Sequence, residues 1–206
     1  MNRVGNEPLP DVANIFRGFY ANFSDQVSGA DFLQFAGSVA VRMCAGPVYK
    51  TVVGREDDPT PCPEFMMPAP FGVNASYEAL TSLWADKGIN ERELAALMGG
   101  HSVSVAFAQQ ANGIPPNTPQ DSTPASMDTN YFKEVQAPVT PSGVGRFESD
   151  INLSDPSTVV GQAFLEYAGD GGLGESLYVV GRDYASADEG PYQLNGRTNT
   201  PPPHTR

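Results

Sequence analysis

The chain contains few basic residues and few residues that bind metals. Its 206 residues include 12 lysines and arginines against 24 aspartates and glutamates, with two cysteines and two histidines. A net charge of −12 argues against nucleic acid or an anionic membrane as a partner, because both require a basic surface. No apolar stretch is long enough to span a membrane. The chain starts without an apolar signal run, so we expect any secretion signal to be absent or already removed.

The scarcity of cysteine also limits what can be said about the compartment. Cys44 and Cys62 stand on either side of a turn-rich segment that could bring them together. A disulfide and two free thiols both remain open, since two cysteines do not establish an oxidising environment. With 40% hydrophobic residues, the chain can form one sizeable core and needs no second domain.

The apolar pattern predicts a mainly α-helical domain with long loops. A helical period runs through residues 11–23 after an Asp11 cap and again through 31–43. The further helices that we expect lie near residues 75–87, 91–103, 128–136 and 157–168, with a weaker one near 174–182. Loops cover 45–72 and 109–127, and we expect the second to be unconstrained unless an ion ties it down. Periodicity is lost near residue 185, which predicts a domain over 1–184 and a disordered tail over 185–206.

One histidine lies at the end of an apolar helical stripe. Leu94, Leu97, Met98 and His101 follow the spacing i, i+3, i+4, i+7, so a single helix face ends in an imidazole. An imidazole in this place can bind a metal through one nitrogen if another group holds its opposite N–H. The plainer alternative is a satisfied histidine at the edge of the core.

An oxygen-rich loop follows this histidine. Asp121, Thr123 and Asp128 alternate carboxylate and hydroxyl oxygens over eight residues, and Ser126 can add a backbone carbonyl. Hard oxygen ligands at this spacing suit calcium. A polar turn capped by aspartates is the alternative.

Three motifs follow one another along the chain. They are Leu-x-x-Leu-Met-Gly-Gly-His-Ser at 94–102, Asp-Ser-Thr-Pro-x-x-x-Asp-x-x-Tyr-Phe at 121–132 and Arg-Phe-x-Ser-Asp at 146–150. Together they resemble the plant and fungal haem peroxidase superfamily, and the secreted fungal peroxidases most closely. Segments 28–37, 53–57 and 68–71 resemble further motifs of the same family, and they follow in the same order. The resemblance covers about residues 1–180 and implies a mainly α, haem-peroxidase-like domain.

The resemblance also implies the roles of particular residues. His101 would be the axial ligand of the iron of haem b, and Asp150 would accept its N–H and increase its anionic character. A helix N-cap is the alternative role for Asp150. The residues that fall on the family's calcium site are Ser102, Asp121, Thr123, Ser126 and Asp128. Trp84, Tyr77 and Arg55 are interpreted as structural, with Arg55 held by ion pairs.

Two departures from the family pattern are visible. Gln120 stands where relatives place a Phe or Trp against the proximal imidazole, and we expect its amide to admit water to the iron ligand. No residue matches the family's distal arginine and histidine, since the chain begins after the corresponding helix and its only other histidine is His204. The sequence thus resembles the proximal part of a peroxidase, and no distal acid or base is assigned.

These observations favour a haem-dependent peroxidase that uses hydrogen peroxide and a small reducing substrate, with weakened activity. The alternatives are a non-catalytic haem-binding or interaction protein, and a truncated half that needs a partner chain or a second copy over its open haem face. The resemblance implies a secreted protein, with a cytoplasmic one as the alternative. The reducing substrate and the oligomeric state do not follow from the sequence.

Overall fold

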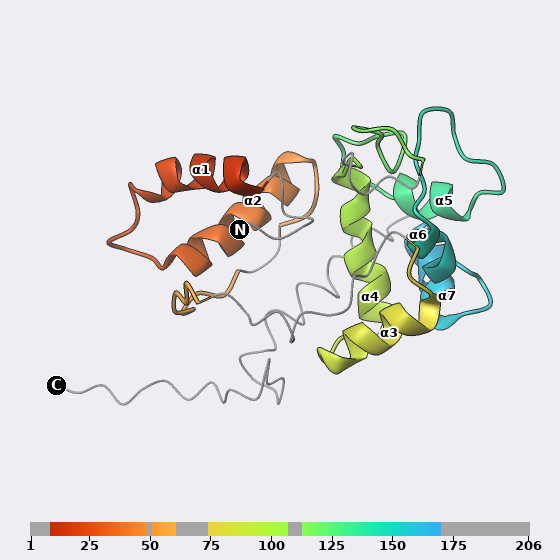
Figure 1. Ribbon diagram of the computed structural model, residues 1–206, viewed down its shortest axis with the longest axis horizontal. Coiled ribbons are helices and arrows are strands. Elements are labelled where there is room, and N and C mark those ends of the chain that lie inside the picture. Colours follow the sequence, from red (N-terminus) through yellow and green to blue (C-terminus); the bar gives the residue numbers. More distant parts are fainter. Residues whose placement is uncertain (1–8, 49–50, 61–73, 107–112, 170–206) are drawn as a thin grey trace.

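The computed structural model in Figure 1 describes residues 9–48, 51–60, 74–106 and 113–169 of the chain. Over these ranges the fold is helical, and one isolated bridge between Val105 and Pro119 is the sole β pairing. This confirms the expected mainly α class. The helices in chain order are α1 (Leu9–Tyr20), α2 (Gly29–Met43), α3 (Tyr77–Asp86), α4 (Glu91–Met98), the 3₁₀ helix η2 (Gly99–Val103), α5 (Asn130–Gln136), α6 (Glu148–Leu153) and α7 (Val159–Tyr167).

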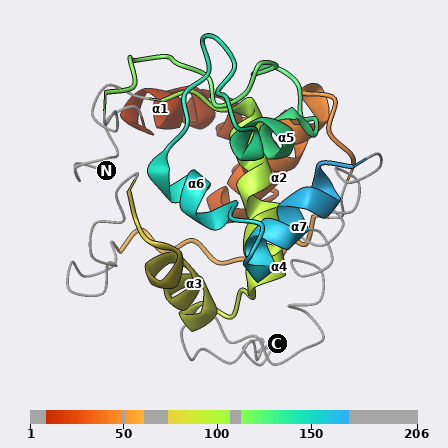
Figure 2. The ribbon, with the colours of Figure 1, turned by 90° about the vertical axis from the view of Figure 1, so that its right-hand side faces the viewer.

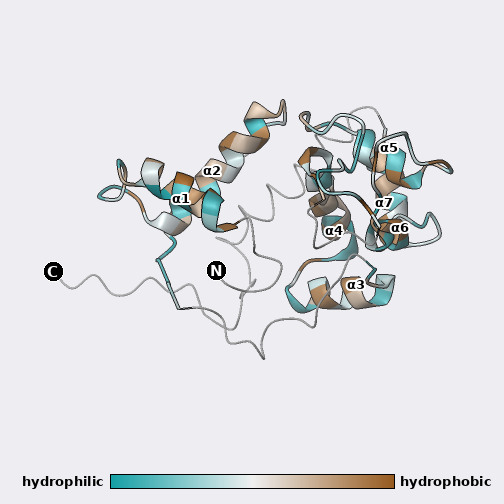
Figure 3. Ribbon diagram, turned by 45° about the horizontal axis from the view of Figure 1, so that its top comes forward, coloured by the Kyte–Doolittle hydropathy of each residue, from teal (hydrophilic) through white to brown (hydrophobic). Residues whose placement is uncertain are grey.

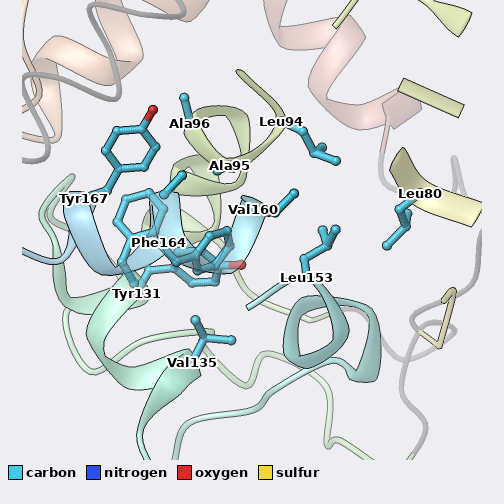
Figure 4. Packing of buried hydrophobic residues seen from close by; sticks show 12 residues of the cluster. Leu80, Leu94, Ala95, Ala96, Tyr131, Val135, Leu153, Val160, Phe164 and Tyr167 are labelled. Atoms are coloured by element: carbon cyan, nitrogen blue, oxygen red, sulfur yellow. The ribbon is translucent and has the colours of Figure 1, made fainter. Parts of the chain in front are cut away.

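The hydrophobic core lies among α3 to α7. Helices α4 and α7 pack against each other, and α5 closes the cluster with its aromatic side chains. Tyr131 of α5 packs beside Phe164 of α7, with ring centroids 5.8 Å apart (Figure 4). Phe132 of α5 meets Phe164 edge to face, with ring centroids 5.2 Å apart. Both rings are fully buried, and replacing such a ring by alanine typically costs about 3–5 kcal/mol. This core therefore supports η2 and α6, which carry His101 and Asp150 (Figure 2).

Helices α1 and α2 form a separate antiparallel pair. Ser28 caps α2 by accepting the backbone N–H of Asp31. The ring of Phe32 in α2 packs against Phe16 of α1 and against Phe23 in the turn that follows α1. Much of the predicted apolar stripe is nevertheless exposed, with Ile15 and Phe19 each at 62%. Figure 3 shows hydrophobic residues alternating with hydrophilic ones along both helices. The period was predicted correctly, but in this structure it does not face the core of α3 to α7.

Several boundaries differ from the sequence prediction. Asp11 is not a cap, because α1 begins at Leu9 and Asp11 lies in its first turn. The helix expected over 91–103 is divided, since Gly99 and Gly100 tighten the chain into η2. Helix α6 was not predicted, because six residues are too few to show a period. The expected helix at 174–182 and the tail at 185–206 lie outside the described residues.

The described part of the second loop, residues 113–127, is held by hydrogen bonds to other protein groups. Ala106 N–H donates to Thr118 O at 2.9 Å, and Gly145 N–H donates to Pro119 O at 2.8 Å. Farther along, Met127 N–H donates to Cys44 O at 2.6 Å and so joins the loop to the end of α2. The expectation that only an ion would constrain this loop is therefore wrong. Asn/Pro/Thr-rich composition does not reveal such long-range backbone partners.

Across the ranges that the structure describes, we find no helix that combines the length and the apolar character needed to cross a membrane.

Candidate functional site

His101 is positioned by a short, firmly capped helix. At the start of α4, Asn90 and Glu93 form a capping box in which each side chain accepts the other residue's backbone N–H. Leu94, Ala95 and Ala96 then bury the helix in the core, whereas Leu97 and Met98 are only half-buried. The predicted buried stripe is thus correct at Leu94, but after Leu94 the most buried residues are Ala95 and Ala96 and not Leu97 and Met98. The turn into η2 replaces 3.6 residues per turn by about three, so His101 leaves the α-helical stripe.

The imidazole of His101 is held from behind by Asp150 of α6. Nδ1 of His101 lies 2.9 Å from Oδ2 of Asp150. The Asp150 side chain is 2% exposed, while that of His101 is 33% exposed. A carboxylate can only accept, so Nδ1 carries the proton, and in the neutral ring Nε2 then holds the lone pair. This tautomer is the one that a metal-binding imidazole requires.

The position of Asp150 excludes the alternative of a helix N-cap. The N-cap of α6 is Phe147, and Asp150 is the third residue of the helix. Besides Nδ1 of His101, the carboxylate accepts a hydrogen bond from Gln120 Nε2 at 2.9 Å and one from Ser149 Oγ at 3.3 Å. Its partners are side chains, with none of the backbone N–H groups that a cap would bind.

Two aromatic rings pack edge-on against the imidazole. The ring centroid of Tyr131 lies 5.5 Å away and that of Phe147 lies 6.5 Å away, with interplanar angles of 86° and 82°. Burial raises the pKa of Tyr131 well above its ordinary value, and the nearby Asp150 carboxylate raises it further. The Tyr131 hydroxyl makes no hydrogen bond of good geometry within the described part of the chain. Sequence reasoning assigned no role to either ring.

Gln120 departs from its predicted role. Its side chain is 4% exposed and bonds to protein groups, so it does not form the predicted water path to the imidazole. The amide lies between Asp150 and Ser104, and Nε2 is also 3.2 Å from Nδ1 of His101. The sequence correctly predicted that Gln120 lies beside the imidazole of His101. Its hydrogen-bond partners, Asp150 and Ser104, could not be predicted from the sequence.

The five residues expected at a calcium site come together beside η2. Ser102 is fully buried, and its Oγ lies 2.7 Å from Oδ2 of Asp121 and 3.1 Å from the carbonyl oxygen of Ser126. The hydroxyl of Thr123 lies 2.8 Å from Oδ2 of Asp128. A backbone carbonyl of Asp128 completes the set at 3.4 Å from Ser102 Oγ. These are carboxylate, hydroxyl and carbonyl oxygens, which are the ligands that calcium accepts.

The charge at this cluster is imperfectly compensated. Burial raises the pKa of Asp121, and the carboxylates of Asp128 and Glu134 add to the rise, whereas hydrogen bonds from Ser102 and Thr123 oppose it. Among the residues that the structure describes, no three His, Cys, Asp or Glu side chains gather around one point. A cation here would therefore need the hydroxyl and carbonyl oxygens as well as the two aspartates.

The remaining singled-out residues have structural surroundings. Arg55 pairs with the buried Asp31 at 3.0 Å, and Tyr77 and Trp84 pack against the core cluster, as expected. Cys44 is partly buried, and Cys62, the other cysteine of the possible disulfide, lies outside the described residues.

Comparison with known proteins supplies the family. A family model described as "Peroxidase" matches residues 3–168. The chain is 36% identical to manganese peroxidase 3 of Phlebia radiata over 130 residues, which are 60% of this chain and 34% of that protein. It is 34% identical to versatile peroxidase VPS1 of Pleurotus eryngii over 156 residues, covering 73% of this chain and 40% of the relative. The cytosolic L-ascorbate peroxidase 1 of Oryza sativa subsp. indica is 33% identical over 132 residues, covering 64% and 50%.

The matched region thus spans between a third and a half of the length of these relatives. The family model, by contrast, covers most of this chain and includes both His101 and Asp150. The motifs, the helical fold and these matches agree, and the chain belongs to the peroxidase family.

Proposed function

We propose that this chain forms the proximal side of a haem peroxidase, with His101 as the axial ligand of the iron of haem b. The observation that carries the proposal is the 2.9 Å contact between Nδ1 of His101 and the buried Asp150. It leaves Nε2 of a partly exposed imidazole as a free electron-pair donor. The half-apolar surroundings, with Tyr131 and Phe147 against the ring, fit a flat hydrophobic cofactor.

The protein's part in the chemistry would be to hold and tune the ligand. Asp150 keeps the Nδ1 proton and makes Nε2 more basic, which stabilises an electron-poor iron. When bound, haem supplies redox chemistry between hydrogen peroxide as the oxidant and a small reducing substrate. Tyr131 and Phe147 restrict the orientation of the imidazole, because both rings pack edge-on against it.

His101 is also the only histidine in the part of the chain that the structure describes, and it faces Asp150. No second described imidazole is available to move the protons of hydrogen peroxide. A positioned acid or base contributes about 10²–10⁴-fold to such a step. We therefore expect the 206-residue chain, loaded with haemin, to oxidise a dye slower than a complete relative by a factor in that range.

The same observation favours a second candidate, a haem-binding protein without catalysis. Tight haemin binding together with no dye oxidation above free haemin would support it. Fast oxidation by the chain alone would contradict both that candidate and the expected slow rate. A second copy that supplies a base would appear as a rate that rises with the square of protein concentration while the dimer is scarce. A different partner chain would appear as a rate that rises when that chain is added.

The ligand assignment is tested by haemin titration of His101→Ala, followed by the Soret band. We expect loss of the ligated spectrum, whereas Asp150→Asn should weaken binding by about 10–100-fold, as other losses behind a metal ligand do. His204→Ala is the matched control, because it removes the only other histidine. Equal spectra and affinities for wild type and His101→Ala would overturn the proposal.

Calcium is proposed as the ion of the oxygen cluster around Ser102. The pKa of the buried Asp121 is raised by burial and by two neighbouring carboxylates. A divalent cation would stabilise the negative charges of these carboxylates. The proposed ligands are oxygens of Ser102, Asp121, Thr123, Ser126 and Asp128. They can contribute most of the roughly six to eight oxygens that calcium takes.

Calorimetric titration with calcium tests this site. We expect a binding heat and a higher melting temperature in wild type, and neither in Asp121→Asn. The exposed Asp86→Asn, at the end of α3, is the control for loss of one carboxylate. A wild-type protein without heat or melting shift would refute the calcium site.

We propose a secreted location from the resemblance to secreted fungal peroxidases. Other matched relatives carry "cytosolic" in their names, so the family match alone does not choose the compartment. Fractionation of the natural source would decide it.

A further inference from the structure

Gln120 places a neutral amide in direct contact with the Asp150 carboxylate. Its Nε2 lies 2.9 Å from Oδ2 of Asp150, which is the same oxygen that faces Nδ1 of His101. Gln120 and Asp150 are both buried, at 4% and 2% exposure, so this contact is shielded from solvent. Shielding makes a hydrogen bond to a charged group stronger than the same bond at the surface.

The direction of the amide follows from the carboxylate that it faces. At its other end, Oε1 of Gln120 contacts Ser104 Oγ, which also lies 2.9 Å from the carbonyl oxygen of His101. A turned amide would put Oε1 against the carboxylate, so that two acceptors would face each other. The NH₂ group of Gln120 must therefore point at Asp150.

Two donors consequently share one oxygen. Since Nδ1 of His101 carries a proton, the 3.2 Å between it and Gln120 Nε2 is the separation of two donors around Oδ2 and not a third hydrogen bond. Each donor takes up part of the negative charge of the acceptor. A carboxylate that already accepts the amide of Gln120 pulls less on the proton of His101.

We propose that Gln120 is a positioning residue that competes with His101 for Asp150 and thereby raises the reduction potential of the bound haem. This inference rests on the proposed function for its second half, because it takes His101 as the iron ligand. A weaker pull on the Nδ1 proton leaves the imidazole less anionic, and a less anionic ligand stabilises ferric iron less. Ser104 contributes by contacting the other end of the amide.

The first test is made on the protein without haem. The variant is Gln120→Met, which keeps the length of the side chain and removes both polar ends. Labelling with ¹⁵N-histidine gives signals from only two residues, His101 and His204, so the Nδ1 proton of His101 can be assigned directly. We expect this proton to move to lower field in the variant, because its hydrogen bond to Asp150 shortens when the competitor is removed.

The matched control is Gln136→Met. Gln136 is a half-buried glutamine that donates from Nε2 to the carbonyl oxygens of Ser154 and Gly161, at 2.8 and 3.0 Å. It loses two hydrogen bonds without touching His101 or Asp150. Ser104→Ala is a second variant, which removes the contact at the other end of the amide. It should shift the proton in the same direction by a smaller amount, because the amide is then held less firmly against Asp150.

The second test measures the reduction potential after haemin is added. We expect the ratio of ferrous to ferric protein at a fixed applied potential to fall about tenfold in Gln120→Met, the lower end of outer-shell effects at metal sites. Tenfold corresponds to about 59 mV for one electron. Gln136→Met should keep the wild-type potential.

The outcomes separate the two proposals. A proton resonance and a potential in Gln120→Met equal to those of Gln136→Met would overturn the role of Gln120 while leaving haem binding intact. Failure of wild type to bind haemin, with the proton shift present, would overturn the proposed function and the effect on the potential but leave the competition for Asp150 standing. If Gln120→Met does not fold, the sign of the shift in Ser104→Ala decides.

Discussion

Asp31 is the buried carboxylate that fixes the segment after α2. It accepts the backbone N–H of Gly54 at 2.6 Å and pairs with the guanidinium of Arg55 at 3.0 Å. Burial alone would raise the pKa of Asp31, but these hydrogen bonds and the charge of Arg55 outweigh it, so the pKa lies below its ordinary value. The protonated form is therefore disfavoured in the folded protein relative to the unfolded chain.

This lowered pKa predicts how the stability of an Asp31→Asn variant changes with pH. A depressed folded pKa contributes stability above the unfolded pKa of about 3.9 and loses it as the pH falls through the folded value. At neutral pH the variant should lose about 2 kcal/mol, the typical worth of hydrogen bonds to a charged group. Thermal melting should show a smaller difference in stability between wild type and Asp31→Asn near pH 3 than at pH 7. A larger difference in acid would contradict the argument, and Asp86→Asn is the exposed control.

The hydroxyl of Tyr131 predicts a stabilising substitution. It is fully buried and has no hydrogen bond of good geometry among the described residues, so the folded protein carries the cost of removing it from water. Tyr131→Phe keeps the ring against His101 and should raise the free energy of unfolding by about 1 kcal/mol. Denaturant titration measures it. A loss of stability would mean instead that the hydroxyl donates to Asp150 in solution.

At the scale of elements, α7 can form only because Gly161 lets the preceding turn approach closely. A Cβ at this position would lie 1.8 Å from the carbonyl oxygen of Asp155, which is backbone and cannot rotate away. Helix α7 also carries Phe164 and Tyr167 into the core, so a displacement here reaches the whole cluster.

Gly161→Ala should therefore destabilise the fold by about 3 kcal/mol, at the upper end of ordinary overpacking. The matched control is Gly18→Ala in α1, where nothing lies within 4 Å of an added Cβ. There the better helix propensity of alanine should add up to about 1 kcal/mol. We expect the denaturant midpoint of Gly161→Ala to lie below that of wild type and the midpoint of Gly18→Ala to lie above it. Equal midpoints for the two variants would contradict this expectation.

The elements show where sequence reasoning succeeds and where it stops. Long amphipathic segments such as α2 were predicted within two residues at each end, because their period is sustained. Helix α6 was missed since it has six residues, yet it supplies Asp150. Motif order found both His101 and Asp150, whereas the contact of Gln120 with Asp150 joins residues 30 positions apart and leaves no local pattern.

Buried side chains are unevenly distributed over the described helices. The core cluster draws its fully buried side chains from α3 to α7, while α1 contributes no buried residue and α2 only Asp31. Amide exchange slows with buried contacts, since exchange needs local opening. The amides of α4, α5 and α7 should accordingly exchange slowest in hydrogen-exchange mass spectrometry, and those of α1 much faster. Comparable protection in α1 and α7 would show that the helical pair is covered in solution.

His101 and Ser102 are consecutive residues of η2, and their side chains belong to two different clusters. One imidazole contacts Asp150, and the neighbouring hydroxyl contacts Asp121. A single peptide unit therefore lies between the proposed iron ligand and the proposed calcium ligand. Linkage requires that any factor by which calcium tightens haem be returned as the same factor by which haem tightens calcium. Loss of either ligand would thus weaken the binding of the other by that same factor.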